Sequence, residues 1–313
     1  MQTESTTQPT TLPQPQFYTW KNYRCAYEVY RPESDETPLL LIHPIGVGLS
    51  RNFWHRFCAE WYNNGPTNPI YSPDLLGCGD SDMPRLAYQP EDWAEQLLYF
   101  IKTVVKKPVV VVVQGALFPV AIKLVQRETK PPENAASWIK GLALSGPPAW
   151  RVITKQRDPL QQKLRWNLFF DTLIGNAFYR YARRRQFLQS FSIKQLFGKA
   201  EDVDENWLTM LQEGAKNPAS RYAVFSFLAG FWRQNYASDI QNIQQPTLVV
   251  FGEQASSISK EGKTESPEER LQDYVKHLPN GEGIKIPGRN VMPYETPTEF
   301  IRPIAPFIQR LSN

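Results

Sequence analysis

The sequence is poor in cysteine and histidine and has no long apolar run. Its three cysteines, Cys25, Cys58 and Cys78, are widely spaced and odd in number. That pattern excludes a disulfide framework and a zinc-binding spacing, and it is typical of a reducing, cytoplasmic compartment. The longest apolar run, residues 108–113, has the length of a strand and is far too short to span a bilayer.

The charges are nearly balanced, with a formal net charge of +4 over 313 residues. The charges are balanced, and the sequence contains no zinc-finger, RRM or helix-turn-helix signature. Nucleic acid is therefore not an expected partner. No motif predicts a metal or an organic cofactor. Residues 1–16 are rich in Thr, Gln and Pro and contain no apolar segment and no arginine. They predict a disordered leader and neither a signal peptide nor a transit peptide.

Short apolar runs alternate with segments of helical period along most of the chain. This alternation is typical of a parallel sheet covered by helices on both faces, an α/β architecture. Residues 17–31 alternate like an antiparallel hairpin at the edge of that sheet. The other predicted strands are mostly rich in Val, Leu and Ile, as strands buried on both faces are: residues 38–43, 69–73, 108–113, 139–145, 246–252 and 283–287.

Helices are predicted between these strands, over residues 52–61, 91–105, 118–127, 267–278 and 297–311. The stretch 147–239 breaks the alternation, because it contains many aromatic residues at helical spacing and no convincing strand. Inserted after a sheet strand, it predicts a helical cap over the carboxyl ends of the strands, where open α/β sheets bind ligands. The expected division is a core of residues 17–146 and 240–313 with a cap of residues 147–239.

Three motifs, in chain order, carry a family resemblance. His43-Pro44-Ile45-Gly46 is followed by Trp54, residues 73–82 are PDLLGCGDSD, and residues 286–288 are IPG, with Pro293 and later Glu295, Pro297 and Phe300 downstream. Together they resemble the oxyanion loop, the D-x-x-G-x-G-x-S-D turn and the final loop of the α/β-hydrolase superfamily. The resemblance implies an α/β-hydrolase fold, with a mostly parallel eight-stranded sheet and an inserted helical cap. Cap residues 173–180 and 203–204 are similar to those of cyanobacterial and plastid members, some of which cleave phytyl esters.

The resemblance also locates a catalytic triad, and no triad position holds a residue able to do the chemistry. In the family the nucleophile lies on a sharp strand-to-helix turn with small neighbours. Aligned with that motif, residues 114–118 place Ala116 at the nucleophile position. The acid and base positions fall on Ala255 and Val291, neither of which can hold a proton. We therefore predict a catalytically inactive homologue, a pseudoenzyme.

The alternative is a carboxylic-ester hydrolase with a non-standard constellation. His43 is the one histidine near the expected pocket, although the family keeps this residue as a structural part of the loop. Its potential partners are polar groups in the neighbouring loops: Cys78, Ser145, Ser256, Ser257 and Glu253. A serine nucleophile needs a base within hydrogen-bond reach. The backbone N–H groups of Ile45 and Leu117 are the expected oxyanion donors.

Without catalysis, the pocket under the cap is free to bind an apolar small molecule. Trp150, Trp166 and Phe231 are expected to face it, while most cap aromatics pack the cap onto the sheet. The second possibility is a scaffold for a protein partner. The run Arg183, Arg184 and Arg185 is either a solvated helix face or a contact for an acidic partner or an anionic membrane surface. Residues 256–267 form either a disordered loop or a partner-binding insertion.

Overall fold

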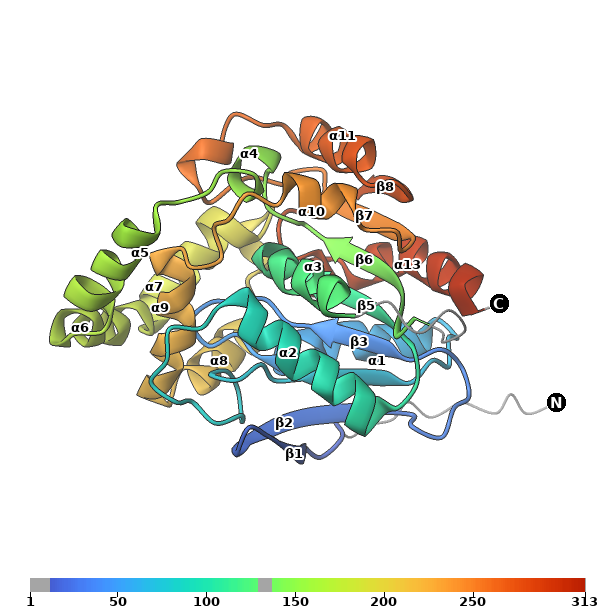
Figure 1. Ribbon diagram of the computed structural model, residues 1–313, viewed down its shortest axis with the longest axis horizontal. Coiled ribbons are helices and arrows are strands. Elements are labelled where there is room, and N and C mark those ends of the chain that lie inside the picture. Colours follow the sequence, from blue (N-terminus) through green and yellow to red (C-terminus); the bar gives the residue numbers. More distant parts are fainter. Residues whose placement is uncertain (1–11, 129–136, 313) are drawn as a thin grey trace.

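The computed structural model describes residues 12–128 and 137–312. Its centre is an eight-stranded sheet in the order β1-β2-β4-β3-β5-β6-β7-β8 (Figure 1). The strands are β1 (Gln16–Trp20), β2 (Tyr23–Tyr30), β3 (Leu39–Ile42), β4 (Ile70–Pro73), β5 (Val109–Gln114), β6 (Ile139–Ser145), β7 (Thr247–Gly252) and β8 (Gly281–Ile286). The pairs β1–β2 and β2–β4 are antiparallel and the others are parallel, so the predicted mostly parallel sheet is confirmed.

The two edges of the sheet differ in how closely they follow the sequence pattern. The predicted hairpin forms β1 and β2, and Lys21 and Asn22 make its turn with positive φ angles of 49° and 67°. Of the leader predicted over residues 1–16, the structure describes 12–16, and Gln16 already belongs to β1. At the other edge, β8 begins at Gly281 and not at residue 283, because most of an edge strand can stay exposed and needs no continuous apolar run.

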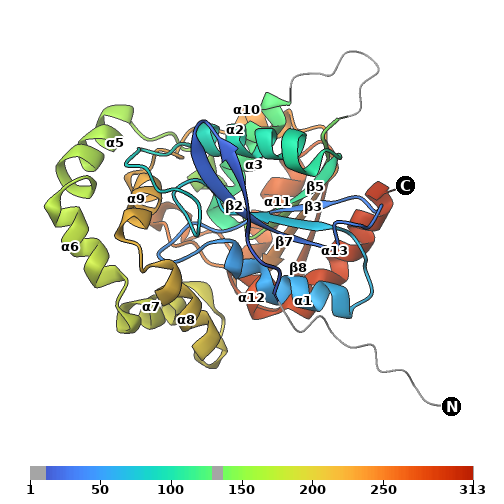
Figure 2. The same cartoon turned by 90° about the horizontal axis from the view of Figure 1, so that it is seen from below.

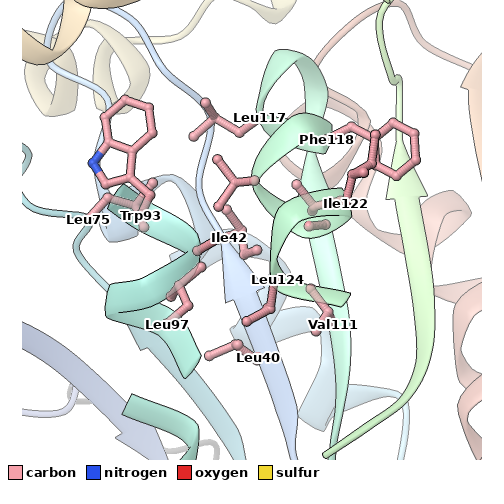
Figure 3. Close-up of a cluster of buried hydrophobic side chains, with 14 of the residues drawn as sticks. Leu40, Ile42, Leu75, Trp93, Leu97, Val111, Leu117, Phe118, Ile122 and Leu124 are labelled. Atoms are coloured by element: carbon pink, nitrogen blue, oxygen red, sulfur yellow. The ribbon is translucent and has the colours of Figure 1, made fainter. Parts of the chain in front are cut away.

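Helices cover both faces of the sheet, as predicted. One face carries α2 (Pro90–Phe100), α3 (Phe118–Arg127) and α11 (Pro267–His277), and the other carries α1 (His55–Asn63), α12 (Met292–Glu295) and α13 (Pro297–Ser312). Alternate residues of β3 pack into two hydrophobic clusters, one on each face of the sheet. Leu40 and Ile42 pack in the cluster under α2 and α3 (Figure 3), whereas Leu39 and Leu41 pack in the cluster under α1 and α13. Since successive side chains of a strand point to opposite faces, β3 is apolar at every position.

Local signals explain several helix boundaries. A capping box of Gln89 and Asp92 begins α2, which continues as a π-helix, Ile101–Val105, and ends at Lys106 with φ of 58°. A second capping box, Ser266 with Glu269, begins α11. The helix predicted from residue 52 begins instead as a 3-10 turn, Arg51–Trp54, before α1.

Between β6 and β7 the described chain contains helices and no strand. The longer ones are α4 (Trp150–Ile153), α5 (Pro159–Arg165), α6 (Leu173–Ala182), α7 (Arg185–Phe191), α8 (Glu205–Gly214), α9 (Arg221–Ala229) and α10 (Ala237–Gln241), with π-helical turns at Trp166–Phe170 and Ser192–Leu196. Figures 1 and 2 both place α5 to α9 beyond one end of the sheet, with α5 and α6 outermost. Within the described ranges no helix is long and apolar enough to cross a membrane.

A buried ion cluster fixes the turn after β4. Asp74 is fully buried and accepts the backbone N–H groups of Arg51 and Asp80, both at 2.8 Å, together with the Arg51 guanidinium. The same guanidinium donates to Glu28 at 2.9 Å and to Asp80 at 2.7 Å. Gly79 has φ of 57°, and a Cβ there would collide with the Asp74 carboxylate. This cluster therefore explains Gly79, Asp74 and Asp80 of the PDLLGCGDSD turn.

Candidate functional site

A cavity of about 310 Å³ lies where the loops after the parallel strands meet the helical insertion. Its lining comes from the loops after β3, β5, β6, β7 and β8 and from α4, α9 and their neighbours: Pro44, Ile45, Leu49, Gln114–Ala116, Gly146–Ala149, Val152, Arg157, Leu196, Phe227, Leu228, Trp232, Arg233, Phe251, Ser256–Ser259, Arg270, Asn290 and Val291. The position agrees with the rule that open α/β sheets bind ligands outside the carboxyl ends of their strands. It is the candidate site.

The sharp turn between β5 and α3 lies at Gly115, one residue before the predicted nucleophile position at Ala116. Gly115 has φ of 64°, in the left-handed region that glycine adopts without steric cost. A Cβ built on Gly115 would meet nothing within 4 Å, and the residue lines the cavity. A side chain at this position would therefore project into the site, as the nucleophile of a strand-to-helix elbow does. The placement at Ala116 is corrected to Gly115, which has no side chain at all.

The other two predicted triad positions hold no titratable group, and of the two only Val291 lines the cavity. Val291 is buried and lines the cavity just before α12. Ala255 is buried in the turn after β7, where its N–H donates to the carbonyl of Gly252 at 2.9 Å. A methyl group and an isopropyl group can neither orient an imidazole nor move a proton.

Asn290, the residue before Val291, joins the loops that a triad would join. Its Nδ2 donates to the carbonyl of Gln195 at 2.7 Å and to that of Ser256 at 2.9 Å, and its Oδ1 accepts the Ser256 N–H at 3.2 Å. Its own carbonyl accepts Nε2 of Gln114 at 2.7 Å. One amide residue thus links the end of β5, the loop after β7 and the π-helical turn of the insertion. These are structural bonds between backbone and neutral amides.

His43 is fully buried, and both of its ring nitrogens are occupied by backbone groups. Its Nδ1–H donates to the carbonyl of Pro44 at 2.8 Å, and its Nε2 accepts the Leu75 N–H at 3.1 Å. The second bond requires an unprotonated Nε2. Burial lowers the pKa of His43, which also favours the neutral ring. With both nitrogens engaged, this imidazole has no free position from which to act as a general base.

The predicted oxyanion donors separate in the structure. Ile45 lines the cavity, and within the described chain no carbonyl accepts its N–H. Leu117 is instead part of the buried cluster under α2 and α3 (Figure 3) and is not among the lining residues. With the turn at Gly115, the N–H that follows the turn residue is that of Ala116, which does line the cavity. Of these two neighbours, Ala116 and not Leu117 is therefore the one that lines the cavity.

None of the alternative nucleophiles is paired with a base. Cys78 is buried, and burial raises the pKa of its thiol. Ser145 Oγ is buried without a partner, and Ser256 Oγ accepts two bonds from the Arg289 guanidinium, at 2.9 and 2.7 Å. Over residues 12–128 and 137–312, no hydroxyl or thiol is hydrogen-bonded to a histidine ring, because His55 binds Glu28 and His277 binds the Asp273 carbonyl.

The three aromatic residues expected in the pocket lie elsewhere. Trp150 stacks on His277, with ring centres 4.2 Å apart, and Trp166 packs against Phe231 at 5.8 Å. None of the three is among the residues that line this cavity. The aromatic wall is formed by Phe227 and Trp232, whose rings stack at 5.1 Å.

The cavity wall also carries three arginines that sequence reasoning missed: Arg157, Arg233 and Arg270. Arg233 and Arg270 are each 3% exposed. No pattern in the sequence marks them, since Arg233 follows an aromatic pair and Arg270 lies in the polar segment EERLQDY, which is typical of a solvated helix. Their burial is a product of tertiary packing.

The segment 256–267 packs against the start of the insertion. Both Glu265 oxygens accept backbone N–H groups at the start of α4, those of Trp150 at 3.0 Å and Arg151 at 3.1 Å. Glu265 is itself buried. The structure describes the whole segment, and residues 256–259 form part of the cavity wall.

The outer surface of the insertion combines exposed apolar and basic side chains. Leu160, Leu164 and Leu168 recur every four residues along α5 and the turn after it, and all are exposed, as are Leu173 and Ile174 at the start of α6. We call these five residues the outer ridge. Of the predicted basic run, Arg183 donates to the carbonyls of Ala215 and Lys216, Arg185 binds Glu205, and Arg184 is exposed.

Comparisons with known proteins place this geometry in context. The sequence matches the family model described as "Alpha/beta hydrolase family" over residues 39–302. Similar solved structures include a thermophilic esterase from Thermogutta terrifontis, with 17% identity, a TM-score of 0.70 and coverage of 96% of this chain and 100% of the esterase. A bromoperoxidase from Bacillus anthracis has 15% identity and a TM-score of 0.69, covering 95% of this chain and 100% of its own. An esterase from Exiguobacterium antarcticum has 14% identity and a TM-score of 0.69, with coverage of 95% and 100%. No match was found among curated proteins.

Proposed function

The chain belongs to the alpha/beta hydrolase family, and we propose that it is a member that binds a small molecule under its cap without cleaving it. The observation that carries the proposal is Gly115, which holds the left-handed turn of the elbow with no side chain. Ala255 and Val291 at the acid and base positions remove the other two roles. The turn of the elbow is thus kept, while the side chains for the nucleophile, acid and base roles are absent.

The cavity is suited to a ligand even without a nucleophile. Its volume of about 310 Å³ lies at the lower end of the range typical of small-molecule sites, about 300–1,000 Å³. Phe227, Trp232 and Phe251 supply an apolar wall, and the free N–H of Ile45 supplies a donor. A ligand bound here therefore lies beside a hydrogen-bond donor suited to an acyl oxygen but meets no nucleophile.

The proposal is tested by chemistry on the purified protein. We expect no turnover of short- or long-chain p-nitrophenyl esters and no labelling by a serine-reactive fluorophosphonate, beside an active esterase as control. Gly115→Ser is the sharper variant, because its hydroxyl would point into the cavity. We expect Gly115→Ser to stay inactive on esters, since no base or acid is present to activate the hydroxyl. Ala116→Ser is the matched control, one residue past the turn.

Ester hydrolysis through a rewired site is the outcome that would overturn the proposal. It would show as reproducible turnover by the unmodified protein that His43→Ala abolishes. The two backbone bonds of the His43 ring argue against that result, because the ring would have to break one of them to accept a proton.

A second function, contact with an anionic membrane surface, is favoured by the outer ridge. Leu173 is 86% exposed and Leu160 70% exposed, which is uncommon for neighbouring large apolar side chains on a monomer. Lys163, Arg165, Arg180 and Arg184 are exposed on the same segment of the insertion. The one acid in residues 159–185, Asp171, is bound to Arg85. An apolar face bordered by cations is the pattern of helices that lie in a membrane interface.

Vesicle sedimentation distinguishes a membrane from a protein partner. We expect binding to vesicles that contain phosphatidylserine, weaker binding to pure phosphatidylcholine, and loss of both in Leu164→Glu/Leu168→Glu. Val275→Glu, at an exposed apolar residue of α11, is the matched control and should bind like the unmodified protein. Equal sedimentation of all variants, or none with any vesicle, would contradict the membrane proposal and leave a protein scaffold as the use of this surface.

A further inference from the structure

The candidate cavity is cationic. Its lining contains Arg157, Arg233 and Arg270 and no aspartate or glutamate. It also contains no histidine, lysine or cysteine, so these guanidinium groups are the only ionisable groups among its lining residues. A purely apolar ligand, as expected from the sequence, would cover these charges without compensating them.

Arg233 is the least compensated of the three. It is 3% exposed, and its Nε and Nη2 have no hydrogen-bond partner within the described residues. The nearest carboxylate oxygen, Oε1 of Glu261, is 3.6 Å from Arg233 Nη2 and 3.9 Å from Arg157 Nη2. One carboxylate is therefore shared between two guanidinium groups, beyond hydrogen-bond distance from each. The other oxygen of Glu261 accepts the Ser259 hydroxyl.

Arg270 approaches the cavity from α11 and is also only partly satisfied. Its Nη2 donates to the carbonyl of Gly262 at 2.8 Å, but its Nε has no partner among the described residues. The nearby Glu265 carboxylate already accepts the N–H groups of Trp150 and Arg151. Burial lowers the pKa of both Arg233 and Arg270, which reflects the loss of solvation that these contacts fail to replace.

A buried guanidinium remains charged, and a buried charge whose N–H groups lack hydrogen-bond partners is unfavourable. A ligand oxyanion would remove that penalty through charge-assisted hydrogen bonds, and arginine binds carboxylate and phosphate groups with two parallel donors. Ser256, Ser257 and Ser259 add hydroxyl groups to the same wall. Phe227, Trp232 and Phe251 give the same cavity an apolar surface, and the Arg233 guanidinium lies 5.4 Å from the ring centre of Trp232.

We propose that the cavity binds an anionic amphiphile, whose carboxylate or phosphate group is held by Arg233 with Arg157 and Arg270 and whose apolar body lies against Phe227 and Trp232. This inference deepens the proposed function by assigning the ligand class. It rests on that function in one respect, namely that the ligand is held and not cleaved. The recognition of the anion itself depends on the arginines alone.

Titration calorimetry with three matched ten-carbon ligands tests the proposal on the full-length protein. Decanoate and decyl phosphate share the apolar body with the neutral decanol, and they differ from each other in the anion. We expect both anions, or one of them, to bind roughly ten- to a hundred-fold more tightly than decanol, as charged hydrogen bonds imply. The preference between decanoate and decyl phosphate identifies the group that the arginines hold.

Variants of the arginines connect the preference to this site. Arg233→Gln should reduce the affinity for the preferred anion to that for decanol, and Arg233→Lys should restore part of it. Arg184→Gln, on the exposed surface of the insertion, is the matched control and should change nothing. Circular dichroism checks that each variant is folded. If Arg233→Gln does not fold, Arg157→Gln, which removes a partly exposed member of the cluster, should give the same loss of preference.

The outcomes separate this inference from the function on which it rests. Equal binding of all three ligands, unchanged in Arg233→Gln, would overturn the anionic ligand and leave a neutral binding pocket. Preferential binding of the anions together with hydrolysis of p-nitrophenyl decanoate would support the anion site and overturn the non-catalytic function. Binding of none of the three would overturn the inference outright.

Discussion

Gly115 and Gly79 have nearly the same backbone conformation, but they are needed for different reasons. Gly115 and Gly79 have φ angles of 64° and 57°, so both use the left-handed region. A Cβ at Gly79 would collide with the Asp74 carboxylate, whereas a Cβ at Gly115 would meet nothing within 4 Å. Gly79 is needed for space and for backbone freedom, while Gly115 is needed for backbone freedom alone.

This comparison gives a stability prediction. Gly115→Ala should lower the free energy of unfolding by about 1–2 kcal/mol, the cost of a left-handed alanine. Gly79→Ala should lower it by clearly more, because the Asp74 carboxylate or its ligands would also have to move. Urea unfolding of both variants beside the unmodified protein measures the two losses. Equal losses would mean that the space around residue 115 is filled.

The exact turn position could not have come from the sequence alone. The segment Gln114-Gly115-Ala116 fits the elbow motif in two registers that differ by one residue. In either register the nucleophile is missing, so the functional prediction does not depend on the choice. The backbone dihedral angle of Gly115 decides between them, and that angle is a property of the folded chain.

At the scale of elements, the cluster of Arg51, Glu28 and Asp74 connects β2, the turn after β4 and the start of α1. Glu28 also accepts His55 Nε2 at 2.8 Å. Burial raises the pKa of Glu28, but the His55 hydrogen bond and the Arg51 charge lower it by more, so the pKa lies below its ordinary value. An acid whose pKa is lower in the folded state stabilises that state when ionised.

The pH dependence follows with a definite sign. The contribution of Glu28 is fully present above the unfolded pKa of about 4.3 and is lost as pH falls through the lower folded value. Glu28→Gln should therefore destabilise the protein by about 1.5–3 kcal/mol near pH 6, and the difference should shrink below about pH 4. Denaturant unfolding at both pH values checks this. A difference that stays constant with pH would show that the Glu28 charge does not contribute.

At the scale of the whole molecule, the layers were predictable and the site was only partly so. The buried strands were found because both faces of each are covered, which forces apolar runs such as residues 109–113. The absence of a triad stays a prediction, because it depends on aligning Ala255 and Val291 with the family's motifs. The directions of Trp150, Trp166 and Phe231 could not be found, since each depends on how its segment is oriented in the packed insertion. The burial of Arg233 and Arg270 has the same origin.

The placement of the insertion has a further consequence, which concerns folding speed. β6 and β7 are hydrogen-bonded neighbours, the sixth and seventh strands across the sheet, yet the whole of residues 146–246 separates them in sequence. Pairing them closes a very long loop, whose entropic penalty grows only logarithmically with length, so equilibrium stability is little affected. Rates are more sensitive, because pairings between distant residues form late. We therefore expect β7 and β8 to join the other six strands in the slow phase of refolding, after the insertion has brought its own ends together.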